Sequence, residues 1–323
     1  MLVERMLSRK EAIVGRMLEA VPSLRALGER GRRFCAMDTN HHLEHLHQAV
    51  AMKEPALFAA YARWVLAVLT SRGIKTGALR TNFQILEEEL AAALDAGERA
   101  SVRLSVQAAL DALEEKPVEP GAPPAEVTPY VEAVLKRANA EAVLVLLGWQ
   151  RERGAAEALR LLGQAQARIG ELWMHNQISV ADEHRATAAA AQGLSALAPF
   201  IAGAPGERPK GKALVACAPG DWHGTGPRIA ADLLELEGFE VEYLGANTPA
   251  EELARAAAEL RPVVIGLGIA PLQALDGARE AIVAVRAAWP AAKVWCGGFA
   301  ARTAGAASLG ADWVSPAPLC PTP

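Results

Sequence analysis

A carboxylate, an imidazole and a glycine lie close together in the loop that follows an apolar segment of the chain. Asp221 precedes His223 by two residues, and Gly226 follows His223 by three. Neutral imidazole is a good ligand for transition metals, and a carboxylate on its second nitrogen fixes its tautomer. Glycine lets a bulky ligand approach the backbone. The spacing therefore favours a ligand-binding loop in which Asp221 supports His223. A solvated histidine and a general base are the plainer alternatives.

The segments around this loop indicate how it is positioned. An apolar run over 213–218 precedes it and an amphipathic run over 227–238 follows it, which predicts a strand, a loop and a helix. Further apolar segments alternate with helical ones, which predicts a flavodoxin-like (Rossmann-like), doubly wound α/β domain. Such sheets bind ligands at the carboxyl ends of their strands. The expected strands lie near 212–218, 240–244, 262–268, 293–296 and 312–314.

Asp221, His223 and Gly226 resemble the base-off, His-on cobalamin-binding motif. In that family the nucleotide tail of the cofactor enters the sheet, beside a Ser-x-Leu or Ser-x-Thr motif on the third strand and a glycine pair on the fourth. Gly268 stands here where the serine is expected, which removes a hydroxyl but is expected to keep the space. The resemblance implies that His223 is the lower axial ligand of cobalt. It also implies a cofactor-binding set of Asp221, Trp222, His223, Gly224, Gly226, Gly268, Gly297 and Gly298.

The segment before the α/β domain is rich in Ala and Leu and has a helical period. Within it, Trp173 is followed ten residues later by Glu183 and His184. This pattern is similar to the helical cap of the CarH-type cobalamin-dependent photoreceptors. The resemblance implies that Trp173 shields the adenosyl group of adenosylcobalamin and that Glu183 and His184 contact it. Taken singly, these residues also suit a core aromatic and the charged first turn of a helix. A histidine follows the tryptophan in that family, whereas Met174 stands here.

Four of the chain's seven histidines fall within residues 41–47. If a helix begins at Asp38 or Thr39, then Asp38, His41, His42 and His45 lie largely on one face. A zinc site and a solvated or inter-helix polar cluster are two interpretations. The third is a pocket for biliverdin, because a histidine-rich helical region before a cap and a cobalamin domain resembles the photocobilins. Its candidate bilin-binding residues are Asp38, His42, His45, Arg63 and Trp64.

Two segments rich in proline, glycine and alanine, 115–124 and 202–209, predict linkers. They divide the chain into four parts. These are an N-terminal helical domain with the candidate bilin pocket (1–114), a four-helix-bundle cap (125–202), the cobalamin-binding α/β domain (210–317) and a tail (318–323).

The composition of the chain limits the classes of partner that we expect. The formal net charge of −4 provides no basic field for nucleic acid, and we expect no DNA-binding domain. The start of the chain is charged and no apolar stretch is long enough to span a bilayer. The four cysteines lack close pairing. We therefore expect a cytoplasmic protein without a membrane partner.

These features lead to two hypotheses about function. The first is a light sensor rather than an enzyme: photolysis of the cobalt–carbon bond of adenosylcobalamin would change cap packing and self-association, with biliverdin as a second chromophore. The alternative is a corrinoid-carrying subunit of a methyltransferase or mutase system. The Trp173–Glu183–His184 pattern favours the first hypothesis.

Overall fold

The computed structural model describes residues 2–74, 76–115, 121, 124–202 and 210–315. Contacts divide the chain into two compact units, Met1–Glu119 and Pro120–Pro323. Most of the two expected linkers, 115–124 and 202–209, and the whole of the expected tail, 318–323, lie outside the described residues.

The first unit is helical throughout its described part. Short turns join its helices, and Pro22 and Pro55 each begin one, where a missing backbone N–H costs nothing. Asp95 closes a capping box with Glu98 before the last helix. The helices are α1 (Leu2–Leu7), α2 (Lys10–Ala20), α3 (Pro22–Ala26), α4 (Glu29–Met52), α5 (Pro55–Ser71), α6 (Gly77–Leu90) and α7 (Ala96–Ala112).

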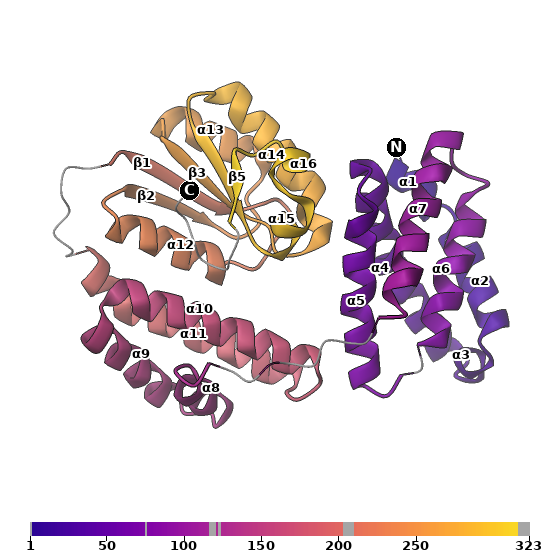
Figure 1. The fold of residues 1–323 in the computed structure, drawn as a ribbon, viewed down its shortest axis with the longest axis horizontal. Helices are drawn as coiled ribbons and strands as arrows, with labels where there is room; N and C mark the ends of the chain where they lie inside the picture. The colour runs from indigo at the N-terminus through magenta and orange to yellow at the C-terminus, as the bar shows by residue number, and fades with distance from the viewer. Residues whose placement is uncertain (1, 75, 116–120, 122–123, 203–209, 316–323) are drawn as a thin grey trace. The chain divides into compact units, whose positions relative to one another are not determined.

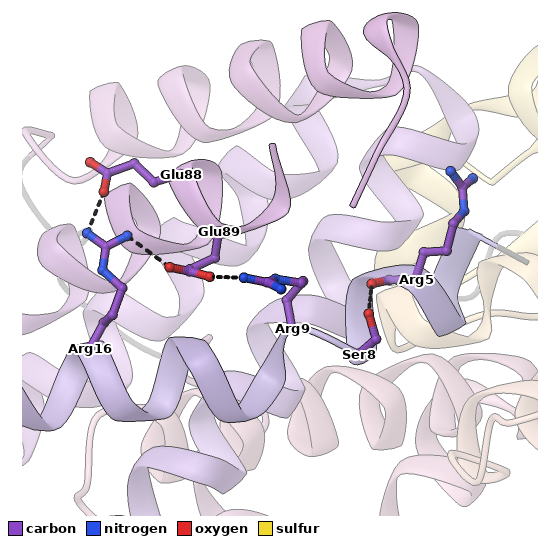
Figure 2. A network of polar contacts seen from close by, with 6 residues as sticks. All are labelled: Arg5, Ser8, Arg9, Arg16, Glu88 and Glu89. Atoms are coloured by element: carbon purple, nitrogen blue, oxygen red, sulfur yellow. Dashed lines mark hydrogen bonds and ion pairs between the residues drawn. The ribbon is translucent and has the colours of Figure 1, made fainter. Parts of the chain in front are cut away.

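Ion pairs connect α2 to α6 across the surface of this unit. Glu89 accepts hydrogen bonds from Arg9 at 2.5 Å and from Arg16 at 3.2 Å, and Arg16 also pairs with Glu88 (Figure 2). The hydrogen bond from Arg9 holds the pKa of Glu89 below its usual value. Ion pairs near a protein surface contribute about 0–1 kcal/mol each. The apolar core, which includes Phe58, therefore supplies most of the stability of the unit.

The histidine-rich segment lies inside α4 rather than at its start. The expectation of a helix beginning at Asp38 or Thr39 is wrong, because α4 begins at Glu29, after Gly28 with a φ of 57°. The shared face is also divided: His42 and His45 are buried, whereas Asp38 and His41 are exposed. The two buried histidines and the apolar residues beside them form the buried face of α4.

Four helices open the second unit, as expected for the cap. A buried cluster joins them, with Tyr130, Leu146, Leu159 and Leu197 fully or almost fully buried. Small residues on the last helix, such as Gly193, let the helices approach closely, because a Cβ there would lie 2.6 Å from Leu146. The helices are α8 (Thr128–Leu135), α9 (Asn139–Arg153), α10 (Ala155–Met174) and α11 (Val180–Ala202).

A parallel sheet follows, with strand order β2-β1-β3-β4-β5 (Figure 1). Its strands are β1 (Lys212–Cys217), β2 (Glu240–Gly245), β3 (Val264–Gly268), β4 (Lys293–Gly297) and β5 (Trp313–Val314). The inner strand β1 is almost fully buried, as strands covered on both faces are. The connections are α12 (Thr225–Leu236), α13 (Ala250–Leu260), the 3-10 turn η1 (Leu272–Ala274), α14 (Leu275–Ala288), α15 (Phe299–Ala304) and α16 (Ala306–Leu309). The α/β prediction is confirmed.

Helix α12 separates the cap from the sheet, and α13 and α14 cover the opposite sheet face (Figure 1). Ile229 and Leu233, one turn apart, belong to the buried cluster of the cap. Ala230, Ala231 and Leu234 belong to the cluster on the sheet. One face of α12 therefore completes the hydrophobic core of the cap, and another completes the core on the sheet. No helix in the described part of the chain is long and apolar enough to cross a membrane.

Candidate functional site

The loop after β1 is held by Asp221, whose side chain is 1% exposed. Its Oδ1 accepts hydrogen bonds from the backbone amide of His223 at 2.8 Å and from Nδ1 of the same residue at 2.7 Å. Its Oδ2 accepts one from the backbone amide of Ala270 at 2.7 Å, in the segment after β3. Both carboxylate oxygens are thus satisfied, and they connect the loop to a second strand end.

This arrangement presents one nitrogen of His223 to a ligand. With Nδ1 carrying the proton that it donates to Asp221, Nε2 keeps its lone pair, and the side chain is 67% exposed. The hydrogen bond to Asp221 raises the pKa of His223, and the charge of Glu183 in the cap adds to that rise. A metal-ligating histidine whose other nitrogen donates to a carboxylate has this geometry.

Two further residues support the loop from outside the motif. The side chain of Asn247 accepts a hydrogen bond from the amide of Gly220 at 2.7 Å, and its own amide donates to the carbonyl of Asp221 at 2.7 Å. Tyr243 Oη donates to the carbonyl of Gly224 at 2.8 Å. Sequence reasoning missed both. Asn247 has a φ of 49°, and an asparagine after a strand is the available signal, since Asn tolerates that conformation.

Two exposed aromatic side chains come from segments at the carboxyl ends of the strands. Trp222, beside His223, is 73% exposed, and Phe299, which follows the glycine pair, is 46% exposed. A single exposed aromatic side chain is ordinary. Trp222, however, lies in the loop after β1 and Phe299 begins the helix after β4, so both belong to the carboxyl edge of the sheet. They supply apolar surface of the kind that a large, flat ligand buries on binding.

The predicted glycines differ in how much space they leave. A Cβ on Gly226 would meet nothing within 4 Å, and one on Gly297 would meet only Trp295, at 3.6 Å. Gly298 has a φ of 109°, which disfavours any side chain there, and a Cβ would overlap the carbonyl of Ile269. The expectation that Gly268 keeps the space of a serine is wrong. A Cβ there would overlap Cγ of Pro227, because the first turn of α12 packs directly on β3.

The predicted cap residues lie at the facing ends of two helices. Trp173 is the penultimate residue of α10 and is half-buried. Glu183 is half-buried in the first turn of α11, where its Oε1 accepts a hydrogen bond from Thr187 at 3.0 Å. His184 is exposed, with Nε2 lying 3.6 Å from Glu183 Oε2. The charge of Glu183 contributes to the raised pKa of His223, less than Asp221 does.

These residues fit a corrinoid with a displaced lower base. Nε2 of His223 is a nitrogen ligand of suitable tautomer, and open positions at Gly226 and Gly297 leave room beside the sheet. Cobalt accepts imidazole nitrogen readily. His223 would hold the metal, and Asp221 would fix its ring.

In the first unit, two of the candidate bilin-binding residues pack against a tyrosine. Nδ1 of His42 lies 2.7 Å from Tyr61 Oη, and His45 stacks on the Tyr61 ring with centroids 3.8 Å apart. Nδ1 of His45 donates to the carbonyl of His41. Burial lowers the pKa of His42 to about 3 and of His45 to about 4. Both are therefore neutral near pH 7.

The other three candidates are nearer the surface. Asp38 is exposed, and Trp64 is 39% exposed. Arg63 makes a two-pronged ion pair with Glu115, through Nε and Nη2 at 2.7 Å each. Among the described residues, no group of three or more His, Cys, Asp or Glu side chains could hold a metal ion. The structure therefore gives the zinc interpretation of this segment no support.

Comparison with known proteins agrees with the geometry of the second unit. Two family models described as B12 binding domains match residues 128–198 and 211–316. The chain is 33% identical over 136 residues to the HTH-type transcriptional repressor CarH of Myxococcus xanthus, covering 42% of this chain and 44% of the relative. It is 28% identical over 163 residues to dimethylamine corrinoid protein 1 of Methanosarcina acetivorans, covering 50% of this chain and 73% of the relative.

A solved structure shares the fold. The monomethylamine corrinoid protein of Methanosarcina barkeri aligns over 58% of this chain and 90% of its own, with a TM-score of 0.50 and 16% identity. The chain spans less than half of the first curated relatives that it matches. The similarities and the His223 geometry together assign a cofactor class to the second unit. Residues 128–198 and 211–316 form a B12-binding module, a helical cap followed by a cobalamin-binding α/β domain.

Proposed function

We propose that this protein is a light sensor that binds adenosylcobalamin between His223 and the cap. The observation that carries the proposal is the Asp221–His223 hydrogen bond, which leaves Nε2 of His223 available to cobalt. The match of a B12 binding domain model to residues 128–198 supports a cofactor role for the cap that contains Trp173, Glu183 and His184. Similarity to the repressor CarH over 136 residues supports the same assignment.

A bound adenosylcobalamin supplies a cobalt–carbon bond that visible light cleaves. The residues of this chain bind and orient that bond. His223 would hold cobalt through Nε2, and Trp173 would cover the adenosyl group and exclude water from it. Glu183 and His184 provide polar contacts for the adenosyl group. The cap packs differently with and without that group, because a buried ligand favours the state that it contacts.

Size-exclusion chromatography of the adenosylcobalamin-loaded protein, in darkness and after green light, tests this function. We expect a light-dependent change in self-association together with a change in the absorbance spectrum. Trp173→Ala should alter the photoresponse and leave the cofactor bound. Trp149→Phe, in the buried cluster of the same cap, is the matched control and should preserve the response. Identical elution and spectra in darkness and light would contradict the proposal.

A corrinoid-carrying subunit is the second candidate function. The match to the dimethylamine corrinoid protein of M. acetivorans, which covers 73% of that protein, favours it. A methyl carrier has no need of the Trp173–Glu183–His184 pattern. We therefore expect it to bind methylcobalamin as tightly as adenosylcobalamin, and Trp173→Ala to change neither affinity. Titration of the wild type with both cofactors in darkness, together with the photoresponse of Trp173→Ala, distinguishes the two functions.

Biliverdin as a second chromophore stays a prediction for the first unit. The buried imidazoles of His42 and His45 are groups that a bilin's pyrrole nitrogens could contact. Their packing on Tyr61 means that a bilin would have to displace existing contacts. Reconstitution with biliverdin followed by absorbance spectroscopy tests it. A spectrum identical to free biliverdin would remove the hypothesis.

A further inference from the structure

Trp295, in the middle of β4, has a buried and unpartnered hydrogen-bond donor. The residue is 5% exposed. Its indole Nε1 has no hydrogen-bond partner among the residues that the structure describes. A buried N–H left without an acceptor costs about 1–3 kcal/mol. Such a group in a native protein therefore calls for an acceptor.

The indole lies beside two glycines, Gly266 of β3 and Gly297 of β4, the second of which is among the predicted cofactor-binding residues. Trp295 pairs in register with Gly266 of β3, and Gly297 pairs with Gly268. A Cβ on Gly266 would lie 2.7 Å from Cε3 and Cζ3 of the indole, so the ring lies across the β3 backbone at that point. Trp295 thereby occupies the space that a side chain at residue 266 would need, and its ring also borders Gly297.

The edge of the ring that carries the donor lies toward Gly297. The indole atom nearest the Cβ position of Gly297 is Cζ2, at 3.6 Å. Cζ2 and Nε1 are bonded to the same ring carbon, so the N–H belongs to this edge. Trp313, paired in register with Trp295 on β5, also has a buried, unpartnered Nε1 among the described residues. It lies one strand farther from the glycine pair.

A corrinoid held by His223 brings the complementary group. In base-off, His-on binding, the benzimidazole nitrogen that would otherwise bind cobalt is released as an acceptor. Buried in the sheet without a donor, that nitrogen would cost as much as the orphaned indole N–H. A hydrogen bond from the indole N–H of Trp295 to the benzimidazole nitrogen would satisfy both groups.

We propose that Trp295 is a specificity-determining residue of the cobalamin site, whose indole Nε1–H donates a hydrogen bond to the ring nitrogen of the displaced lower base. The proposal rests on cobalamin binding with His223 as the lower ligand. It implies a preference for corrinoids whose lower base has a ring nitrogen acceptor. The preference comes from this side chain and not from the motif around His223.

Equilibrium titration of the full-length protein with three corrinoids tests the proposal. Cobalamin has the benzimidazole nitrogen, a phenolyl cobamide has a ring without such a nitrogen, and cobinamide has no lower base. Trp295→Phe should weaken cobalamin binding about tenfold, which is about 1.4 kcal/mol. The same variant should bind cobinamide and the phenolyl cobamide as the wild type does.

Trp289→Phe is the matched control. Its indole Nε1 already donates to the carbonyl of Pro262 at 2.9 Å. This variant should leave all three affinities unchanged. A cobalamin-specific loss in Trp289→Phe as large as that in Trp295→Phe would overturn the proposal, because the effect would then be general to the domain.

Other outcomes are equally clear. If Trp295→Phe weakens cobalamin and the phenolyl cobamide equally, the indole acts by packing, and the proposed hydrogen bond is wrong. Unchanged affinity for all three corrinoids also overturns it. A base-on spectrum of the wild-type cobalamin complex would overturn both the Trp295 proposal and its premise that His223 is the lower ligand. A base-off spectrum with unchanged Trp295→Phe affinities would overturn only the Trp295 proposal.

If Trp295→Phe fails to fold, a measurement on the wild type still tests the proposed hydrogen bond. With ¹⁵N-labelled tryptophan, the indole N–H signals of the full chain are recorded with cobalamin and with cobinamide. Tryptophans near the corrin should respond to both. The signal of Trp295 should move downfield with cobalamin alone. No signal that separates the two corrinoids would contradict the hydrogen bond.

Discussion

Asp221 holds His223 by two hydrogen bonds, because one carboxylate oxygen accepts from both the backbone amide and Nδ1 of that residue. The second oxygen is taken by the amide of Ala270. Three donors thus converge on a side chain that is 1% exposed. The carboxylate therefore sets the position of the backbone, the direction of the ring and the tautomer together.

Asp221→Asn should weaken cobalamin binding about 10- to 100-fold, as the loss of an outer partner of a metal-ligating histidine does. An amide can face His223 with its oxygen or Ala270 with its oxygen, but the NH₂ group then opposes a donor on the other side. Titration followed by absorbance measures the affinity, and ¹⁵N spectra of the histidine ring report the tautomer.

Asp312→Asn is the control for that variant. Asp312 also accepts a backbone amide, that of Val294, and it pairs with Arg286. The substitution should lower stability and leave cobalamin affinity intact. Equal affinity losses in both variants would refute the role given to Asp221.

Gly268→Ser should destabilise the second unit, although serine is the residue typical of this motif position. A Cβ at residue 268 overlaps Pro227, and overpacking of this kind costs about 1–3 kcal/mol. Gly170→Ala, on an open part of α10, should instead raise stability by about 0.4–1 kcal/mol. Thermal unfolding followed by circular dichroism compares them. A Gly268→Ser protein as stable as the wild type would mean that α12 shifts at little cost.

Asp232 should make the second unit less stable as pH rises. Burial raises its pKa to about 6, against which the ion pair with Arg228 acts only partly. A carboxyl with a raised pKa binds its proton more tightly in the folded state. Its contribution is therefore complete below the unfolded pKa near 4 and is lost as pH rises through 6. Over this range we expect a loss of about 3 kcal/mol.

Urea unfolding between pH 4 and pH 7 measures that slope, and Asp232→Asn should flatten it. Glu240→Gln, on the exposed end of β2, provides a comparison in which the slope should persist. A slope that survives in Asp232→Asn would assign it to another group.

The buried histidines of the first unit should produce the opposite pH dependence. Burial lowers the pKa values of His42 and His45 to about 3 and about 4. A histidine with a depressed pKa contributes stability that is complete above about pH 6.5 and is lost as pH falls toward the folded value. His42→Phe should reduce this acid sensitivity, whereas His41→Asn, at an exposed position, should not. Unfolding free energies measured from pH 7 to pH 4 would disprove the assignment if both variants matched the wild type.

Local patterns in the sequence were sufficient for the sheet and for the ligand loop. Apolar runs bounded by glycine and proline marked the strands, and Asp221 and His223 lie close enough in sequence for their pairing to be predicted. Contacts between distant segments were not predictable in this way. The overlap at Gly268 depends on Pro227, and the orphaned indole of Trp295 depends on glycines of another strand.

The start of α4 shows the same limit. Asp38 and Thr39 are good helix-capping residues, and that local preference made a helix start there one option. The helix instead begins nine residues before Asp38, because burial of residues such as Cys35 and Leu43 extends one apolar face through the capping residues. Tertiary packing outweighs the preference of a single residue.

The two-sided burial of α12 has a consequence for how residues 124–202 and 210–315 unfold. Stripping the cap away would leave Ile229 and Leu233 in water, and melting the sheet would remove the support of Ala230 and Leu234 on the same few turns. Neither half can therefore lose its structure cheaply while the other persists. Heat or denaturant should take both apart in one cooperative transition.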